Sequence, residues 1–446
     1  MKTPRIVMVG GGSVNWSPKL INDLLLTDTL QAAEFVLLDT DINAGERMAK
    51  FGNMLCEKRG ISSSFSYTDK QSEAFPGADF VLITISTGDL DAMEHDLIIP
   101  EKYGIYQTVG DTVGPGGWAR ALRNIPVFEQ MAKNIEKYAP SAIVLNYTNP
   151  MAVLTNVFYK VSGLKTVGLC HGLFEVYDAL MKIFDLEKES DIKVRFGGLN
   201  HFFWLLDMKI KGEDGYAMLK EKLAGRPFSA LFEKQIEDEM NFKSGLDVCS
   251  ELLDRYGYLT YAADRHTSEF LPNYLSGDEA KLKKYHLVRT YISDRRKRKN
   301  DNYDKLSAYI SGEAEYQGVR SRETAADIIN AFILGDDFID VVNLPNIGQI
   351  SNLPEGSIVE TLGLVNSIGF TPITAGPLPA PLLNTVLPHA VNQNTLVEAG
   401  LSGDLEMAFN ALYNDPLCGH LTLSEIREMG MELLQANKQY LPQFSL

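Results

Sequence analysis

The chain has 446 residues and a formal net charge of −16 at pH 7. Such an acidic protein is not expected to bind nucleic acid or an anionic membrane surface, and no apolar stretch of the sequence is long enough to span a membrane. The length favours two packed domains over one. The cysteines are widely spaced and form no paired motif, which is typical of a reducing compartment, so we expect a cytoplasmic protein. They are Cys56, Cys170, Cys249 and Cys418.

The first elements predict a dinucleotide-binding βαβ unit. A β-branched strand at 5–9 ends in three glycines, a helical pattern follows, and a second strand at 34–38 ends at an acid. Glycines let the backbone approach a pyrophosphate at a helix N-terminus, and the acid can accept hydrogen bonds from a ribose, which favours NAD over NADP. Because Asn15 stands where the usual motif has its third glycine, an ordinary strand-to-helix turn is the alternative. The candidate cofactor-binding residues are Gly10, Gly12, Ser13 and Asp39.

Three further apolar strands are predicted at 78–85, 141–145 and 165–169, with helical patterns between them. The longest helix is expected to begin at Trp118, after a glycine-rich loop. This alternation predicts an α/β fold with a doubly wound, Rossmann-like parallel sheet, whose ligands bind at the carboxyl ends of the strands. Asn149 follows one of these strands and is therefore expected at that edge.

The character of the sequence changes near residue 190. We predict an NAD-binding Rossmann domain over 1–190 and an α+β domain for substrate binding and oligomerisation over 191–446. In the second part, a dense polar cluster lies at 258–272 between apolar flanks. The basic run YISDRRKRKN at 291–300 is interpreted as a solvated helix face or a linker.

Cys170 and His201 are the candidate metal ligands. Cys170 ends a predicted strand and His201 lies in another strand-like run, so the two residues can meet only through the fold. A thiolate and an imidazole from two segments can hold a divalent metal and leave positions open for substrate. The alternatives are a buried free cysteine and a core histidine, and the spacing alone does not decide between them.

Seven segments of the chain are distinctive. They are GGGS at 10–13, GDTVGPGG at 110–117, NYTNP at 146–150, GLCHG at 168–172, GLNHFFW at 198–204, ADRHTSEFLP at 263–272 and VNLPNIGQISNLP at 342–354. Together they resemble glycoside hydrolase family 4, the NAD- and metal-dependent glycosidases, over nearly the whole length. One segment would be weak evidence, but seven in order are hard to assign to chance.

The resemblance implies an architecture like that of lactate and malate dehydrogenases and a redox-assisted elimination. NAD removes a hydride from C3 of the sugar, a base removes the C2 proton, a metal stabilises the enediolate, and the glycosidic oxygen leaves. Water then adds and the hydride returns. The implied cofactors are NAD and Mn(II), or another divalent metal such as Co, Ni or Fe, and the implied assembly is a homodimer or homotetramer.

The resemblance also assigns roles to single residues. Cys170 and His201 match the metal ligands of the family. His171 can protonate the leaving oxygen or bind a sugar hydroxyl, and its alternative is a hydrogen-bonded residue behind the ligands.

Three residues besides His171 are considered for a catalytic role. Asp264 lies in the region from which many members of the family supply a tyrosine base, and it is the candidate C2 base, with Tyr261 as the fallback. Asp111 is a further catalytic candidate near the expected site, and its alternative is an aspartate that only forms a turn.

Asn149, Arg265 and His266 are the candidate substrate-binding residues, with Asn146 a weaker one. Arg265 offers a planar fork that suits a carboxylate. The segments GDTVGPGG and DRHTSEFLP resemble α-galacturonidases, whereas Cys-His-Gly at 170–172 resembles α-glucuronidases. The expected substrate is therefore a small glycoside or oligosaccharide of a hexuronic acid.

Other functions remain open at this stage. Within the family, an α-galactosidase or an α-glucosidase is the alternative. Outside it, an NAD-dependent 2-hydroxy-acid dehydrogenase shares the βαβ opening but needs no metal thiolate, and a sensing protein would keep the fold without turnover. Net release of NADH from a simple hydroxy acid would favour the dehydrogenase.

Overall fold

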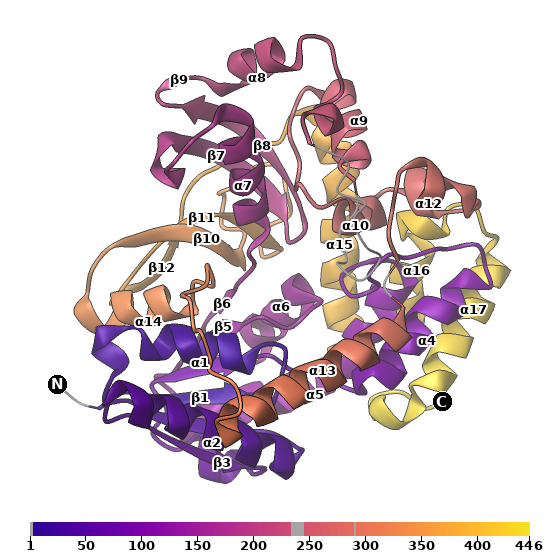
Figure 1. Ribbon diagram of the computed structural model, residues 1–446. Helices are drawn as coiled ribbons and strands as arrows, with labels where there is room; N and C mark the ends of the chain where they lie inside the picture. The colour runs from indigo at the N-terminus through magenta and orange to yellow at the C-terminus, as the bar shows by residue number, and fades with distance from the viewer. Residues whose placement is uncertain (1–2, 233–244, 290) are drawn as a thin grey trace.

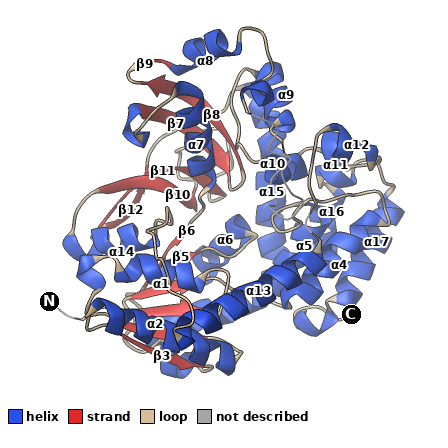
Figure 2. Cartoon of the chain, viewed as in Figure 1, coloured by secondary structure: helices blue, strands red, loops and turns tan. Residues whose placement is uncertain are grey.

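The computed structural model describes residues 3–232, 245–289 and 291–446. Within these residues the chain forms one mixed sheet with helices on both faces (Figures 1 and 2). Its parallel half contains, in spatial order, β3 (Ser64–Thr68), β2 (Glu34–Leu38), β1 (Arg5–Val9), β4 (Phe80–Ile83), β5 (Ile143–Asn146) and β6 (Lys165–Gly168). The antiparallel half continues with β10 (Phe338–Pro345), β11 (Ile358–Asn366), β7 (Ile192–Leu199), β8 (Phe202–Ile210) and β9 (Glu213–Asp214), while β12 (Gly369–Pro372) pairs with β11.

The parallel strands are apolar because both of their faces are covered. Val7 of β1 pairs with Val36 of β2 on one side and with Val81 of β4 on the other, and all three side chains are buried. The doubly wound parallel sheet predicted from the alternation of elements is therefore confirmed, and its carboxyl edge carries the loops that follow β1, β4, β5 and β6.

The first part of the chain supplies helices to both faces of the parallel strands. They are α1 (Ser17–Leu25), α2 (Ile42–Arg59), α3 (Gln71–Ala74), α4 (Asp89–Glu101), α5 (Gly114–Tyr138), α6 (Met151–Val161) and α7 (Gly172–Phe184). Two of them differ, because α4 packs on α5 and α7 packs against β7 and β8. The core with α1 and α2 lies on one face of the sheet, and the core with α5 and α6 lies on the other. α5 begins before Trp118, because the Gly-Pro-Gly-Gly segment already forms its first turn.

The remaining helices belong to the second part of the chain. They are α8 (Gly215–Leu223), α9 (Asp247–Tyr256), α10 (Asp264–Thr267), α11 (Pro272–Leu275), α12 (Ala280–Lys284), α13 (Ile292–Ser311), α14 (Ala325–Leu334), α15 (Ala380–Ser402), α16 (Leu405–Tyr413) and α17 (Leu423–Ala436). α14 joins the core of α1 and α2, while α15, α16 and α17 pack with α5. Among the described residues, no helix combines the length and the apolar character that crossing a bilayer requires.

The two halves of the sheet meet at β6 and β10. Asn343 of β10 pairs with Gly168 of β6 in antiparallel orientation, so the sheet runs without a break past residue 190. The predicted division at 190 stays a prediction. What matters for the site is that β6, the β7–β8 hairpin and α10 all approach the carboxyl edge of the parallel strands.

α13 corrects the interpretation of the basic run. The run forms the first turns of this helix, and Arg296 and Lys299 point outward to pair with acids of α4. Arg295, by contrast, is only partly exposed, and burial lowers its pKa to about 10. Asp111 and Arg265 lie among its charged neighbours. The basic run is thus not only a solvated face, because one of its arginines points toward the inside of the molecule.

Candidate active site

The glycine turn after β1 is too narrow for side chains. Gly10 has a φ of +78°, and a Cβ there would lie 2.5 Å from the carbonyl oxygen of Thr84. A Cβ on Gly12 would lie 2.6 Å from the Cβ of Ala44. The backbone N–H of Gly12 donates to Asp39 Oδ2 over 2.9 Å. Only glycine fits such a turn, and it leaves the backbone open to a ligand at the start of α1.

Ser13 and Asp39 complete this turn. The N–H of Ser13 donates to the carbonyl of Gly10 over 3.0 Å, and its hydroxyl accepts from the N–H of Trp16 over 3.4 Å. Burial raises the pKa of Asp39, while the N–H groups of Asp41 and Gly12 oppose that shift. The structure thus brings the four predicted cofactor residues together, and the space that a Cβ would fill fits the backbone approach that a dinucleotide needs.

A second site lies beyond the carboxyl edge of the sheet, where three potential ligands converge. The ligand atoms of Asp111, His201 and His266 all lie within 4.8 Å of one another. Asp111 belongs to the loop before α5, His201 to the turn between β7 and β8, and His266 to α10. His201 has a φ of +65°, which is uncommon for a residue with a side chain and is often found at functional sites.

Each imidazole of this cluster keeps one ring nitrogen available for a further partner. Thr112 Oγ1 lies 2.9 Å from His201 Nδ1, which leaves Nε2 for another partner. The ring of His266 lies 4.0 Å from that of His201, and its buried Nδ1 has no hydrogen-bond partner in the part of the chain that the structure describes. A buried nitrogen without a partner is costly, and a bound metal would relieve that cost.

The charges of the cluster also suit a divalent metal. Burial lowers the pKa of His201 to about 4 and that of His266 well below its usual value, so both imidazoles are neutral at pH 7. Burial alone would raise the pKa of Asp111, but His266, His201 and Arg120 together hold it well below its usual value. Two neutral imidazoles and one carboxylate are a donor set for Mn(II), Fe(II) or a similar ion.

Cys170 is not a member of this three-residue cluster. Its buried thiol follows β6 and accepts from the N–H of Gly172 over 3.3 Å. Burial, followed by the charge of Glu360, raises its pKa well above the usual range. A metal that engages Cys170 would have to displace the thiol proton.

Glu360 is a residue that the sequence reasoning missed. It is fully buried in β11, and its Oε2 accepts from Asn200 over 3.1 Å and from Asn343 over 2.8 Å. Burial raises its pKa to about 7. A single acid in the otherwise core-like strand at 358–365 was the available signal. Because Asn200 directly precedes His201, this network supports the hairpin turn that presents the imidazole.

His171 lies at the rim of the site. Its side chain is 41% exposed, and its ring nitrogens are 3.7 Å from Glu323 and 4.0 Å from Glu175, too far for hydrogen bonds. It remains close enough to influence the pKa of His201. This position suits a group that exchanges protons with solvent.

Asp264 and Tyr261 occupy different places. The two carboxylate oxygens of Asp264 accept from the N–H groups of Val248 and Cys249, over 2.7 and 2.9 Å, in the first turn of α9. Burial raises the pKa of Asp264 to about 8. Tyr261 is 1% exposed, and its ring stacks 5.8 Å from that of His201. The geometry commits Asp264 to the start of α9 and puts Tyr261 beside the cluster.

The predicted substrate residues also differ in their surroundings. Asn149 donates from Nδ2 to Asp111 Oδ2 over 3.3 Å, so it lies at the cluster. Asn146 is buried and bonds within its own loop and to Thr155. The Nε and Nη2 of Arg265 donate to the carbonyls of Val288 and Thr108, over 2.9 and 3.2 Å. His266 belongs to the metal-type cluster described above.

Two further residues near the cluster were given no functional role from the sequence, although Glu269 belongs to the polar cluster at 258–272. Arg120, in α5, donates from Nε to the carbonyl of Asn149 over 2.9 Å. Glu269 accepts from the N–H groups of Val109 and Gly110, over 2.7 and 2.8 Å, and so holds the loop that carries Asp111. Arg120 lies three residues after the glycine-rich segment 110–117, and no sequence pattern distinguished it from the other residues of the predicted helix.

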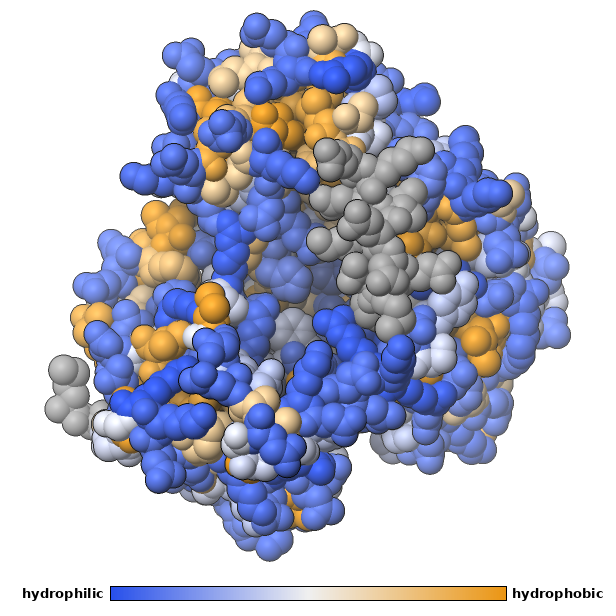
Figure 3. Space-filling model, in the orientation of Figure 1, coloured by the Kyte–Doolittle hydropathy of each residue, from blue (hydrophilic) through white to orange (hydrophobic). Residues whose placement is uncertain are grey.

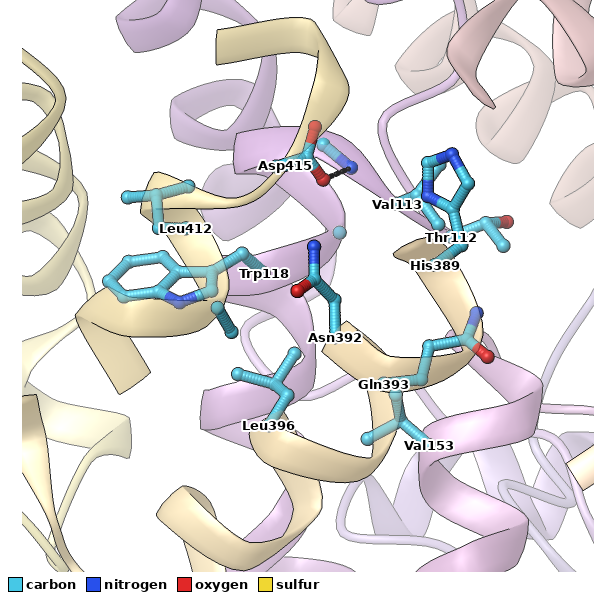
Figure 4. Close-up of a pocket in the computed structure, with 13 residues that line it drawn as sticks. Thr112, Val113, Trp118, Val153, His389, Asn392, Gln393, Leu396, Leu412 and Asp415 are labelled. Carbon is cyan, nitrogen blue, oxygen red and sulfur yellow. Dashed lines mark hydrogen bonds between the residues drawn. The ribbon is translucent and has the colours of Figure 1, made fainter. Parts of the chain in front are cut away.

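The face of the molecule in Figure 3 is hollowed near its middle, and mainly hydrophilic residues surround the hollow. A separate cavity of about 30 Å³ lies between α5, α15 and α16 (Figure 4). Thr112, Asn392 and Gln393 line it, and the buried amide nitrogens of the latter two have no hydrogen-bond partner among the described residues. This cavity has room for about one water molecule and is too small for a sugar.

Comparison with known proteins extends over both parts of the chain. The sequence model of the Family 4 glycosyl hydrolases matches residues 5–186, and the model of their C-terminal domain matches residues 196–418. An α-galacturonidase from Thermoanaerobacter italicus is 35% identical over 449 residues, which cover 98% of this chain and 97% of that protein. An α-galacturonidase from Bacillus subtilis is 35% identical over 444 residues and covers 98% of both chains.

Solved structures agree with these relationships. The crystal structure of lplD from Bacillus subtilis has a TM-score of 0.89 and 32% identity, and covers 97% of this chain and 100% of that one. A 6-phospho-α-glucosidase from gut microorganisms, in complex with NAD and Mn²⁺, has a TM-score of 0.83 at 20% identity and covers 100% of both chains. A lactate dehydrogenase from Cryptosporidium parvum has a TM-score of 0.53 at 16% identity, covering 90% of this chain and 98% of that one, which confirms the dehydrogenase-like fold.

Proposed function

Because the chain belongs to glycosyl hydrolase family 4, we propose that it hydrolyses α-galacturonides with NAD and a divalent metal ion, Mn(II), as cofactors. The observation that carries this proposal is the 35% identity to α-galacturonidases over 98% of the chain. The buried Asp111–His201–His266 cluster supports it with a donor set for the metal, and the glycine turn supports it with a place for the dinucleotide.

Each cofactor has residues that fit it. Gly10, Gly12, Ser13 and Asp39 would hold NAD. His201 with Asp111 and His266 would hold the metal, with the buried Cys170 thiol after β6 as a further ligand. When bound, NAD exchanges a hydride with the sugar, and the metal polarises the sugar oxygens. Asp111 is then a ligand rather than a proton donor, and His266 a ligand rather than a substrate contact.

Proton transfer falls to two other residues. Tyr261 is the proposed base, because its ring stacks beside that of His201 while both oxygens of Asp264 accept backbone hydrogen bonds. Burial raises the pKa of the Tyr261 hydroxyl well above its usual value, so this group would have to lose its proton in the loaded site before the phenolate oxygen could take the C2 proton. His171 is the proposed acid that gives a proton to the leaving oxygen, because its ring is partly exposed at the rim and can be recharged from solvent.

Substrate contacts follow from the same geometry. Asn149 would bind a sugar hydroxyl beside the metal, since its amide reaches Asp111. Arg265 contributes positive charge near the cluster, although two of its nitrogens bond to backbone carbonyls. A homodimer or homotetramer and a cytoplasmic location are retained as parts of the proposal.

The test is hydrolysis of p-nitrophenyl α-galacturonide, α-glucuronide, α-galactoside and α-glucoside with NAD and Mn(II). We expect cleavage of the galacturonide that disappears when NAD is omitted or a chelator is added. Matched reactions with NAD alone and Mn(II) alone are the controls. Cleavage of only a neutral glycoside would reject the uronide, and cleavage that persists without NAD would reject the redox-assisted reaction.

A further inference from the structure

Arg120 occupies an unusual electrostatic position beside the cluster. Its Nε donates to the carbonyl of Asn149, whose side chain in turn donates to Asp111. The guanidinium is therefore anchored one residue away from the carboxylate of the cluster. It is 9% exposed, and it comes from the first turns of α5, a helix whose N-terminal glycines pack closely against the loop that bears Asp111.

Each acid near Arg120 is engaged by another group. Its acidic neighbours are Asp111, Asp96 and Asp89, and Arg123 is a further charged neighbour. Asp96 forms a bidentate pair with Arg123, over 2.7 and 2.6 Å, and both side chains are fully buried. Asp89 pairs with Lys299 on α13, and Asp111 belongs to the cluster with the two histidines. Arg120 thus forms no ion pair with a carboxylate among the described residues.

The terminal nitrogens of Arg120 are correspondingly available. Nη1 and Nη2 form no hydrogen bond to any residue that the structure describes, and neither is completely shielded from solvent. Holding a guanidinium out of bulk water without a carboxylate is unfavourable, and burial indeed lowers the pKa of Arg120. A planar fork fixed at Nε and open at both Nη atoms is pre-organised for a bidentate carboxylate.

We infer that Nη1 and Nη2 of Arg120 bind the carboxylate of a sugar acid and set the preference of the enzyme for uronides over neutral glycosides. This inference rests on the proposed function, because it names the residue that recognises the negative charge of the substrate in the same site. Asn149, anchored by the same arginine, would contact a hydroxyl of that sugar, so one side chain would position both the acid and the hydroxyl contact.

A phosphate of NAD is the other anion that a guanidinium could bind in such an enzyme. The glycine turn, where the pyrophosphate is expected, lies after β1, whereas Arg120 is bonded to the loop after β5. The two anions can be distinguished by comparing substrates. A neutral galactoside has no carboxylate, so loss of a carboxylate contact affects only galacturonides, whereas loss of a contact to an NAD phosphate affects every substrate.

The experiment compares wild type with Arg120→Lys, Arg120→Met and the matched control Arg296→Gln, which removes a guanidinium from the outer surface of α13. For each protein, kcat/KM is measured on p-nitrophenyl α-galacturonide and α-galactoside. Calorimetry then gives the Kd values of galacturonate, galactose and NAD, and thermal unfolding reports folding.

We expect Arg120→Met to lower the ratio of galacturonide to galactoside kcat/KM by about 10- to 100-fold, the value of a hydrogen bond to a charged group. The galacturonate Kd should rise by a similar factor, while the Kd values of galactose and NAD stay within about twofold. Arg120→Lys, which keeps the charge without the fork, should lie between wild type and Arg120→Met. Arg296→Gln should match wild type in every measurement.

Two outcomes would overturn the inference. One is an unchanged ratio in folded Arg120 variants, including an equal loss on both substrates, and the other is a weaker Kd for NAD. If wild type cleaves the galactoside but not the galacturonide, the proposed function fails separately. The inference would still stand in that case if wild type bound galacturonate more tightly than galactose and Arg120→Met removed the difference.

Discussion

The glycine turn and the Asp111–His201–His266 cluster are built in opposite ways. The turn takes three of its four candidate residues from one stretch, 10–13, and its geometry is dictated by close approaches that only glycine permits. The cluster takes one residue from each of three distant segments. The turn is therefore specified by residues that are neighbours in the sequence. The cluster, in contrast, forms only when β8 and α10 pack against the loop before α5.

The two regions also present opposite chemistry. The turn offers backbone N–H groups and one acid, which suits a pyrophosphate and a ribose. The cluster offers two neutral imidazoles and an ionised carboxylate, with arginines nearby. If these sites are as separate as the structure indicates, single substitutions should damage one and spare the other. The predictions below test that separation, from the largest expected effect to the smallest.

Replacing His201 should have the largest effect. We expect His201→Ala to lower kcat on the preferred glycoside by about a thousandfold or more, because loss of metal-ion stabilisation costs several kcal/mol in the transition state. Mn(II) bound per chain, measured by elemental analysis after gel filtration, should fall, while NAD affinity should stay the same. Full Mn(II) occupancy in the variant would remove His201 from the metal site.

Tyr261 and Asp264 provide the next contrast. Tyr261→Phe should lower kcat by about 10²- to 10⁴-fold, the usual contribution of a positioned proton-transfer group. Asp264→Asn should mainly lower stability, by about 0.5–2 kcal/mol, because it weakens the hydrogen bonds at the start of α9. Steady-state kinetics with thermal unfolding separates the two effects. A large loss of kcat in a well-folded Asp264→Asn, with an active Tyr261→Phe, would return the role of base to Asp264.

Asp415 should make the free energy of unfolding of the protein depend on pH. It accepts from the N–H groups of Leu417 and Gly114, and burial raises its pKa to about 6. Because the folded state binds this proton more tightly than the unfolded state, protonated Asp415 favours folding at low pH. That contribution is lost as pH rises from about 4 through 6, and it amounts to about 3 kcal/mol at most.

The Asp415→Asn variant measures this contribution. Urea unfolding of wild type and Asp415→Asn at pH values from 4 to 7 should show wild type losing stability relative to the variant across the same window. Since Asn does not titrate, the difference should be flat above about pH 7. A constant difference over the whole range would show that Asp415 is already ionised in the folded protein at pH 4.

Gly12→Ala should give the smallest effect and should affect only the turn. Its Cβ would lie 2.6 Å from the Cβ of Ala44 and 2.9 Å from Asp39 Oδ2, so the turn must shift. Such overpacking typically costs about 1–3 kcal/mol, which predicts an NAD Kd that is about 5- to 150-fold weaker. Mn(II) content should be unchanged. Gly163→Ala, at an exposed position without a positive φ where the added Cβ would meet only Glu136 Oε1 at 3.5 Å, is a control for the introduction of a methyl group outside the site.

Much of the fold could be predicted from the sequence. The apolar strands and the helical patterns between them were sufficient for the doubly wound sheet, because burial on both faces requires continuous apolar strands. The first turn of α5 was missed, because Gly-Pro-Gly-Gly has low helix propensity and forms a helix here in a buried setting. Arg295 was missed for a different reason: a run of basic residues gives no indication of which one faces the site.

The sequence by itself determined the glycine turn and its acid, the alternation that builds the sheet, and the segments that pointed to the family. Only the tertiary structure decided the partners of each polar side chain. It put His266 with Asp111 and His201, and it committed Asp264 to the start of α9. It also anchored Arg120 to Asn149. The physical reason is that backbone conformation follows from neighbouring residues, whereas ligand geometry and pKa depend on groups that approach one another only when the distant segments pack together.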